Sequence, residues 1–289
     1  MGPYRKVLFP TDYSANSKHA FAHALQLTKF EQGELIIQHV VSDYFERTPH
    51  WITLFDVREL QLQLDSFAGL EMEKMLRSIP RDVTVRSVIS KGRTAEEIVA
   101  LAEKEFVDLV VMGSAAGNVT NSVIRATNRP VLAVSTHLET PIALSAGLRS
   151  ILVTTDFSEH SKKVVQYACG LQRAFGASIY LMYVIETTRE IEFALKQGHY
   201  TDAGERMKEW AMNQLLNLIP DESLNDSRIV RMVERGNAIE RIAAVAREMA
   251  VDLTVLGTHE YGATHSHFLK STTDKLLSRL ESPVLAVKM

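Results

Sequence analysis

Two segments of the sequence place an aspartate two residues before a serine. Asp12 precedes Ser14 in the first segment, and Asp156 precedes Ser158 in the second. A carboxylate at such a position can accept hydrogen bonds from a ligand, or it can stabilise the positive end of a helix that begins just after it. The two interpretations are compatible, and the sequence leaves both open.

A second candidate for chemistry is the loop 259–267. It combines three imidazoles with a carboxylate: His259, Glu260, His265 and His267. These side chains are zinc ligands. The helical His-Glu-x-x-His pattern is not met, because Ala263 stands where its second histidine would be. We therefore expect solvated loop residues and keep zinc binding as an alternative.

A histidine pair, His19 and His23, is spaced by four residues, and such a pair can chelate a metal on an exposed helix. The residues at the matching positions later in the chain are Lys163 and Tyr167, which form no such pair. We expect His19 and His23 to lie on a solvated helix face.

The aspartate segments belong to a long internal repeat. The sequence from Lys6 aligns with the sequence from Ser150, at an offset of 144 residues. Three landmarks recur at that offset, Gly92 as Gly236, Asp108 as Asp252 and Gly113 as Gly257. A period this long indicates duplicated domains. We assign residues 1–146 to the first and 147–289 to the second.

Each copy alternates strands and helices. In the first copy we predict strands at 6–10, 34–41, 83–89, 109–112 and 131–134. We predict helices from Ser14 or Ser17 to Thr28, and at 54–79, 94–105 and 119–127. Short, nearly continuous apolar runs suit parallel strands that are covered on both faces. The fold class is therefore α/β, with two tandem Rossmann-like, doubly wound domains, each a five-stranded parallel sheet flanked by helices.

In doubly wound sheets, ligands bind beyond the carboxyl ends of the strands, where the strand order reverses. The residues that follow the first strand of each copy are Asp12 and Thr155-Asp156. Those that end the fourth strand are Gly113-Ser114 and Gly257-Thr258. A ligand site is expected at this edge.

The motifs named so far, taken together, resemble the universal stress protein family. They are the strand followed by Asp-x-Ser, the strand ending in His39-Val40 or Tyr183-Val184, the Asp-Leu-x-Val-x-Gly strand and the terminal Pro-Val-Leu-Ala-Val. The resemblance covers nearly the whole of both copies, so the chain looks like a tandem member. It implies binding of ATP, ADP or AMP. It also implies pseudo-two-fold pairing of the last strands, 131–134 and 284–287, with a homodimer as a further possibility.

In the ATP-binding branch of that family, the fourth strand leads into Gly-x2-Gly-x9-Gly-Ser/Thr, whose glycines let backbone N–H groups approach phosphates. The first copy reaches Gly117-Asn118 directly, so most of this loop is missing. The second copy keeps the length, but Glu260 and Lys270 replace two glycines. The glutamate repels a polyphosphate, whereas Lys270 attracts it, so AMP-like ligands are favoured over ATP.

The resemblance therefore implies a nucleotide site chiefly in the second copy. Its expected residues are Thr155, Asp156, Val184, Gly257, Thr258, Lys270, Ser271 and Thr272. The weaker set in the first copy is Asp12, Val40, Gly113 and Ser114.

Composition limits the other functions. The net charge of −3 gives no overall attraction to nucleic acid, and no apolar run approaches the roughly 18 residues of a membrane helix. The single cysteine, Cys169, corresponds to Leu25 and is expected to be packed on a helix face, in a reducing compartment. We expect a soluble, cytoplasmic protein.

The leading interpretation is a non-enzymatic stress-response protein, because the sequence shows no general base with an obvious partner. One alternative is a scaffold protein that has lost nucleotide binding, and another is a zinc-binding protein that uses the loop 259–267. The segment 44–55, with Trp51 and Phe55, would be a partner surface if it were exposed.

Overall fold

The computed structural model describes residues 4–42, 57–114, 118–135, 148–188, 193, 201–258 and 273–288. The chain divides into two compact units, Met1–Thr136 and His137–Met289. The predicted boundary between 146 and 147 lies outside the described residues, so it stays a prediction. The segment 44–55 also lies outside them. No helix among the described residues is long and apolar enough to cross a membrane.

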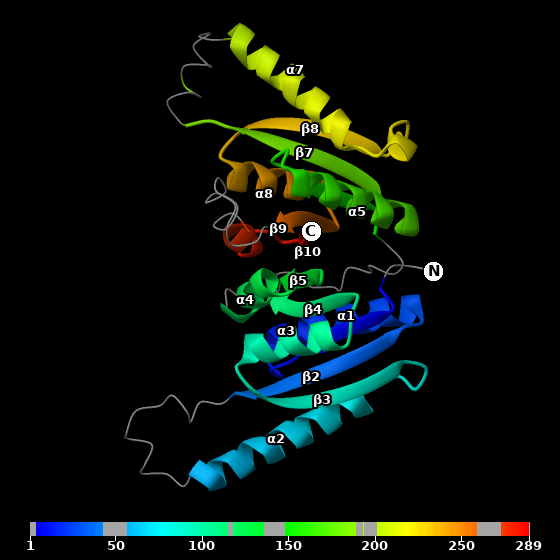
Figure 1. Cartoon of the computed structure of the whole chain (residues 1–289), viewed down its shortest axis with the longest axis vertical. Helices are drawn as coiled ribbons and strands as arrows, with labels where there is room; N and C mark the ends of the chain where they lie inside the picture. Colours follow the sequence, from blue (N-terminus) through cyan, green and yellow to red (C-terminus); the bar gives the residue numbers. More distant parts are fainter. Residues whose placement is uncertain are drawn as a thin grey trace. The chain divides into compact units, whose positions relative to one another are not determined.

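The first unit alternates strands and helices along the chain (Figure 1). Its elements are β1 (Lys6–Pro10), α1 (Ala15–Glu31), β2 (Glu34–Ser42), α2 (Val57–Arg77), β3 (Thr84–Gly92), α3 (Thr94–Lys104), β4 (Leu109–Ser114), α4 (Asn118–Ala126) and β5 (Val131–Ser135). The strands pair in the order β3-β2-β1-β4-β5, and all pairs are parallel. The order reverses between β1 and β4.

The second unit repeats this plan. Its elements are β6 (Ser150–Thr154), α5 (Glu159–Phe175), β7 (Ser178–Glu186), α7 (Thr201–Leu218), a 3-10 turn (Asp221–Ser223), β8 (Ile229–Gly236), α8 (Ala238–Glu248), β9 (Leu253–Thr258), a short helix at 273–277 and β10 (Val284–Lys288). The order β8-β7-β6-β9-β10 matches the first unit strand for strand. The predicted fold class is confirmed, and the switch point lies between β6 and β9.

Helices cover both faces of the first sheet, as two neighbouring residues of β2 show. The Gln38 side chain donates to the carbonyl of Glu97 in α3, at 3.1 Å. His39 stacks instead on Tyr13, whose hydroxyl donates to the carbonyl of Ala68 in α2. Because successive side chains of a strand point to opposite faces, α3 and α2 flank opposite sides of the sheet.

The cores are apolar, and their largest fully buried side chains come mostly from the strands. Phe9, Leu35 and Ile37 of the first unit and Ile151, Leu152 and Leu181 of the second are fully buried. Such side chains contribute roughly 1.5–3 kcal/mol each when buried. At the opposite edge from the switch point, the repeated aspartates join strands: Asp108 accepts from the Lys6 amide at 2.8 Å, and Asp252 from the Ser150 amide at 3.0 Å. These two repeated residues are therefore structural.

The expectation of a solvated face for His19 and His23 is wrong for His23, which is only 1% exposed. The buried stripe of α1 runs through Ala20, Ala24 and Leu27. Helical periodicity places residue 23 within that stripe. Cys169, by contrast, is buried on its helix face as expected. Burial raises the pKa of its thiol, which suits a packing role.

Candidate ligand-binding site

Each unit has a cavity at its switch point. The second-unit cavity has a volume of about 210 Å³ and lies between the carboxyl ends of β6, β7 and β9. The first-unit cavity has a volume of about 490 Å³ and lies between those of β1, β2 and β4. Most residues that line the second-unit cavity have counterparts in the lining of the first, which contains further residues such as Leu64 and Phe67. The duplicated elements therefore build a cavity at the same place in each unit.

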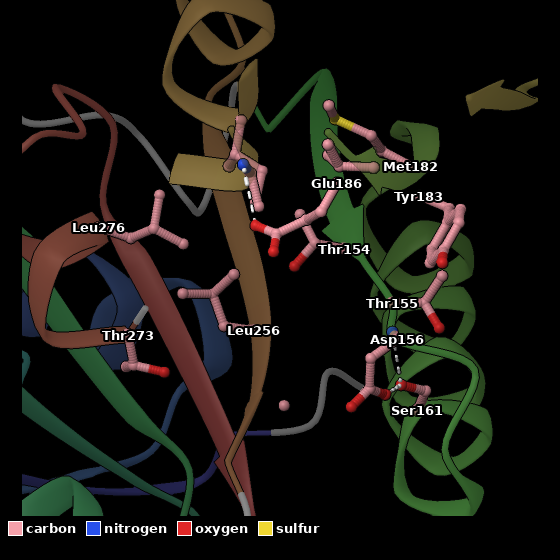
Figure 2. Close-up of a pocket in the computed structure, with 14 residues that line it drawn as sticks. Thr154, Thr155, Asp156, Ser161, Met182, Tyr183, Glu186, Leu256, Thr273 and Leu276 are labelled. Carbon is pink, nitrogen blue, oxygen red and sulfur yellow. Dashed lines mark hydrogen bonds between the residues drawn. The ribbon is translucent and has the colours of Figure 1, made fainter. Parts of the chain in front are cut away.

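The turn after the first strand supplies the aspartate of each cavity. In the second unit the Phe157 amide donates to the Thr155 hydroxyl at 3.0 Å, and the Ser158 amide donates to Asp156 Oδ1 at 3.0 Å. The Ser161 hydroxyl donates to the same oxygen at 2.6 Å (Figure 2). These bonds fix the carboxylate at the cavity wall.

The corresponding turn of the first unit has the same form. The Tyr13 amide donates to the Thr11 hydroxyl, and the Ser14 amide donates to Asp12 Oδ1, each at 3.0 Å. Burial alone would raise the pKa of Asp12, but hydrogen bonds from Ser14 and Ser17 outweigh it and lower the pKa. Asp12 is thus held as an anion.

The helix caps are the serines and not the aspartates. Ser14 and Ser158 have extended backbones, and their hydroxyls accept from the amides of Ser17 and Ser161. This is the usual N-cap geometry. Each aspartate accepts a hydrogen bond from the backbone amide of the cap serine, which follows it two residues later. The two carboxylates therefore also lie near the positive ends of the helices.

An aromatic residue with a left-handed backbone completes each turn. Tyr13 has φ 61° and Phe157 has φ 62°, a conformation that is uncommon for residues other than glycine. Tyr13 stacks on His39, with ring centroids 4.6 Å apart, and Phe157 lies 4.2 Å from Tyr183. The turns are therefore anchored to the second strand of each unit.

A third aromatic side chain extends each pair to a long helix. Phe67 of α2 meets Tyr13 edge-on, and Trp210 of α7 meets Phe157 edge-on at 5.4 Å. Phe67 and Trp210 are about half exposed. Burial raises the pKa of Tyr13 to about 12, with a further contribution from the charge of Glu71.

The end of the second strand forms another wall, and here the two cavities differ. The second unit presents Met182, Val184 and Glu186, and the first presents Gln38, Val40 and Ser42. Glu186 accepts from the Ala238 amide at the start of α8, at 3.3 Å. Ser42 instead bonds to Thr94 through the two hydroxyls, at 3.1 Å.

The glycines that end the fourth strands differ in what lies against them. A Cβ atom at position 113 would lie 2.7 Å from the carbonyl oxygen of Asn16 in α1. Among the described residues, a Cβ at position 257 would meet a methyl group of Val164, at 3.1 Å. Close packing of α1 therefore requires Gly113 whether or not a ligand binds.

Four residues predicted for the second site line one cavity: Thr155, Asp156, Val184 and Gly257. Thr258 follows directly, but it is not part of the lining, and its buried hydroxyl has no partner among the described residues. Lys270, Ser271 and Thr272 lie outside the described residues. In the first unit, Asp12, Val40 and Gly113 line the cavity. The side chain of Ser114 lies outside the described part of the chain. The roles of all these residues stay predictions.

Sequence reasoning missed several lining residues. Ser161 was recognisable, because Ser17 repeats it at the offset of 144. Glu186 could not be recognised from the repeat, because the residue at the equivalent position of the first copy is Ser42. The apolar walls from later helices were also missed: Ile242 and Leu276 in the second unit, and Ile98 in the first.

Within the described ranges, no three His, Cys, Asp or Glu side chains come together in a way that could hold a metal ion. The loop 259–267, with the histidines considered for zinc, lies outside those ranges.

Comparisons with known proteins agree with this architecture. The model of the universal stress protein family matches residues 3–135 and 147–288. A universal stress protein of Methanocaldococcus jannaschii is 29% identical over 153 residues, covering 45% of this chain and 94% of its own length. One of Methanothermobacter thermautotrophicus is 30% identical over 131 residues, covering 45% of this chain and 88% of its own length.

One solved structure matches both units at once. It is a universal stress protein from Archaeoglobus fulgidus with a TM-score of 0.71 and 18% identity, and the match covers 99% of this chain and 98% of that one. At this identity the likeness supports the fold. Because the family model matches both repeats over nearly all their length, this chain belongs to the universal stress protein family and carries two copies of its domain.

Proposed function

We propose that this protein is a non-enzymatic stress-response protein of the cytoplasm that binds an adenine nucleotide or nucleoside, chiefly in the second unit. The observation that carries the proposal is the second-unit cavity, where Asp156, Val184 and Gly257 meet at the switch point. The stress-response role rests on family membership. The single buried cysteine is consistent with a reducing compartment.

The walls of this cavity suit a purine and a sugar. Ile242, Leu256 and Leu276 form apolar surfaces against which a flat ring can pack. Figure 2 shows Leu256 and Leu276 on the side of the cavity opposite Asp156. Asp156, fixed by Ser161, is a strong acceptor for sugar hydroxyls. Pockets for small molecules commonly combine apolar walls with a few fixed polar groups in this way.

The same residues support binding without turnover. The described lining of the second cavity contains no histidine, cysteine or lysine. Asp156 Oδ1 accepts from both Ser158 and Ser161. A general base needs a nucleophile within hydrogen-bond reach and a partner that orients it. We therefore propose that occupancy, rather than catalysis, is what the protein reports.

Calorimetric titration with AMP, ADP and ATP tests the proposal. We expect micromolar to submillimolar binding by the wild-type protein, weakened at least tenfold in Asp156→Ala, because the fixed acceptor is lost. Asp12→Ala is the matched control, since it removes the equivalent carboxylate of the first unit, and it should leave most of the affinity.

Two outcomes count against the proposal. Unchanged affinity in Asp156→Ala would remove the assigned site. Absence of binding at millimolar nucleotide, with no thermal shift, would favour the scaffold alternative, in which the replaced glycine positions, Glu260 and Lys270, mark a lost phosphate loop.

A further inference from the structure

We infer that the second-unit cavity prefers an uncharged nucleoside to a phosphorylated nucleotide, and that Glu186 sets this preference. The inference rests on the proposed function, because it names the ligand class of the same site. It is carried by the charges that line the two cavities.

The described lining of the second cavity carries two carboxylates and no cationic side chain. Asp156 lies on the turn after β6, and Glu186 lies at the end of β7. Figure 2 shows them at separate places on the wall, Asp156 beside Ser161 and Glu186 beside the start of α8. A phosphate group entering this space would meet negative charge from two directions.

A hydrogen bond to the start of α8 fixes the position of the Glu186 carboxylate. Its Oε1 atom accepts from the Ala238 amide at the N-terminus of α8, where the helix dipole stabilises a negative charge. The Asn237 side chain caps the same helix by accepting from the Glu240 amide. The helix end that could otherwise receive a ligand anion is thus occupied by two groups of the chain itself.

The environment of Tyr183 shows that both carboxylates act on one region. Burial raises the pKa of this phenol, and the charges of Asp156 and Glu186 raise it further. Tyr183 is one of the residues that line the cavity. The pKa of Tyr183 therefore agrees with two negative charges in this part of the second unit.

The first unit provides an internal comparison. Ser42 stands at the position of Glu186, and its hydroxyl bonds to Thr94. The described lining of the first cavity has one carboxylate, Asp12, and also contains His39. Its volume of about 490 Å³ exceeds the 210 Å³ of the second.

A nucleoside meets the requirements of the second cavity. Carboxylates accept hydrogen bonds, so the best ligand offers donors at two places: sugar hydroxyls for Asp156 and an amino or ring N–H group for Glu186. Its flat base would pack on Ile242 and Leu256. Adenosine combines these features without a phosphate.

The experiment uses the full chain with Trp51→Phe, which leaves Trp210 as the only tryptophan. Trp210 lies against Phe157, next to Asp156, so its fluorescence reports the second unit. Adenosine, AMP and ATP are titrated at constant ionic strength. We expect adenosine to bind at least tenfold more tightly than ATP, and Glu186→Gln to reduce that ratio at least threefold.

Glu240→Gln is the matched control. It removes the same charge from the first turn of α8, but Glu240 does not line the cavity, so the ratio should change less than twofold. ATP binding as tightly as adenosine, or equal effects of the two substitutions, would overturn the inference while leaving the proposed function intact. If no adenine compound binds, the inference and the proposed function both fail.

Discussion

At the scale of single residues, Gly113 and Gly257 look equivalent in the sequence but have different surroundings. Gly113 lies against the backbone of α1, whereas the described neighbour of Gly257 is a single methyl group of Val164. We predict that Gly113→Ala lowers the free energy of unfolding by about 1–3 kcal/mol, because a helix must shift. Gly257→Ala should cost less than about 1 kcal/mol. Denaturant unfolding of both variants checks this, and equal losses would show that α1 does not set the requirement.

Residues also show how far the sequence could predict the site. The repeat located Asp156, Val184 and Gly257, because each has the same or a similar residue 144 positions earlier, and they do line one cavity. It could not locate Glu186, which differs from Ser42. A difference between two otherwise matching copies is itself a signal, and it marks the position where the cavities diverge.

At the scale of elements, periodicity placed the strands and helices within a few residues of their observed ends. The face of α1 that packs against the sheet was harder to predict from the sequence. The sequence predicted a solvated face for both His19 and His23, yet the buried stripe includes His23. Which stripe a helix buries depends on how the sheet beneath it twists, and a single helix sequence does not contain that information.

The contact between the β1–α1 turn and α2 predicts a pH dependence. Tyr13 donates to the carbonyl of Ala68 and is 8% exposed. Its pKa is raised from 10.0 to about 12. The folded state therefore favours the neutral phenol. This stabilisation is complete below pH 10 and is lost as the pH rises through about 12, at about 1.4 kcal/mol per pH unit.

Urea unfolding at pH 9 and pH 11 measures this effect. The wild-type protein should lose more stability between the two values than Tyr13→Phe, which has no ionisable group at this position. At pH 9 the variant should already be less stable by about 1 kcal/mol, the usual value of one hydrogen bond. Parallel losses in both proteins would mean that Tyr13 does not contribute.

At the scale of the whole molecule, the duplicated domain predicts that the halves recognise each other. The pairing of strands 131–134 and 284–287 stays a prediction of the sequence. If it is right, fragments 1–146 and 147–289 produced together should elute as one complex on size-exclusion chromatography, because each supplies an edge strand to the other. Fragments that fold but elute as separate monomers would contradict the pairing and favour a simple tether.

The most direct measurement for the central claim is a crystal structure of the full chain grown with millimolar adenosine or AMP. We expect electron density for the ligand in the second unit, in contact with Asp156, Val184 and Gly257, with the base on Ile242 and Leu256. Density at a place bounded by none of these residues, or an unliganded second cavity at saturating concentration, would contradict it.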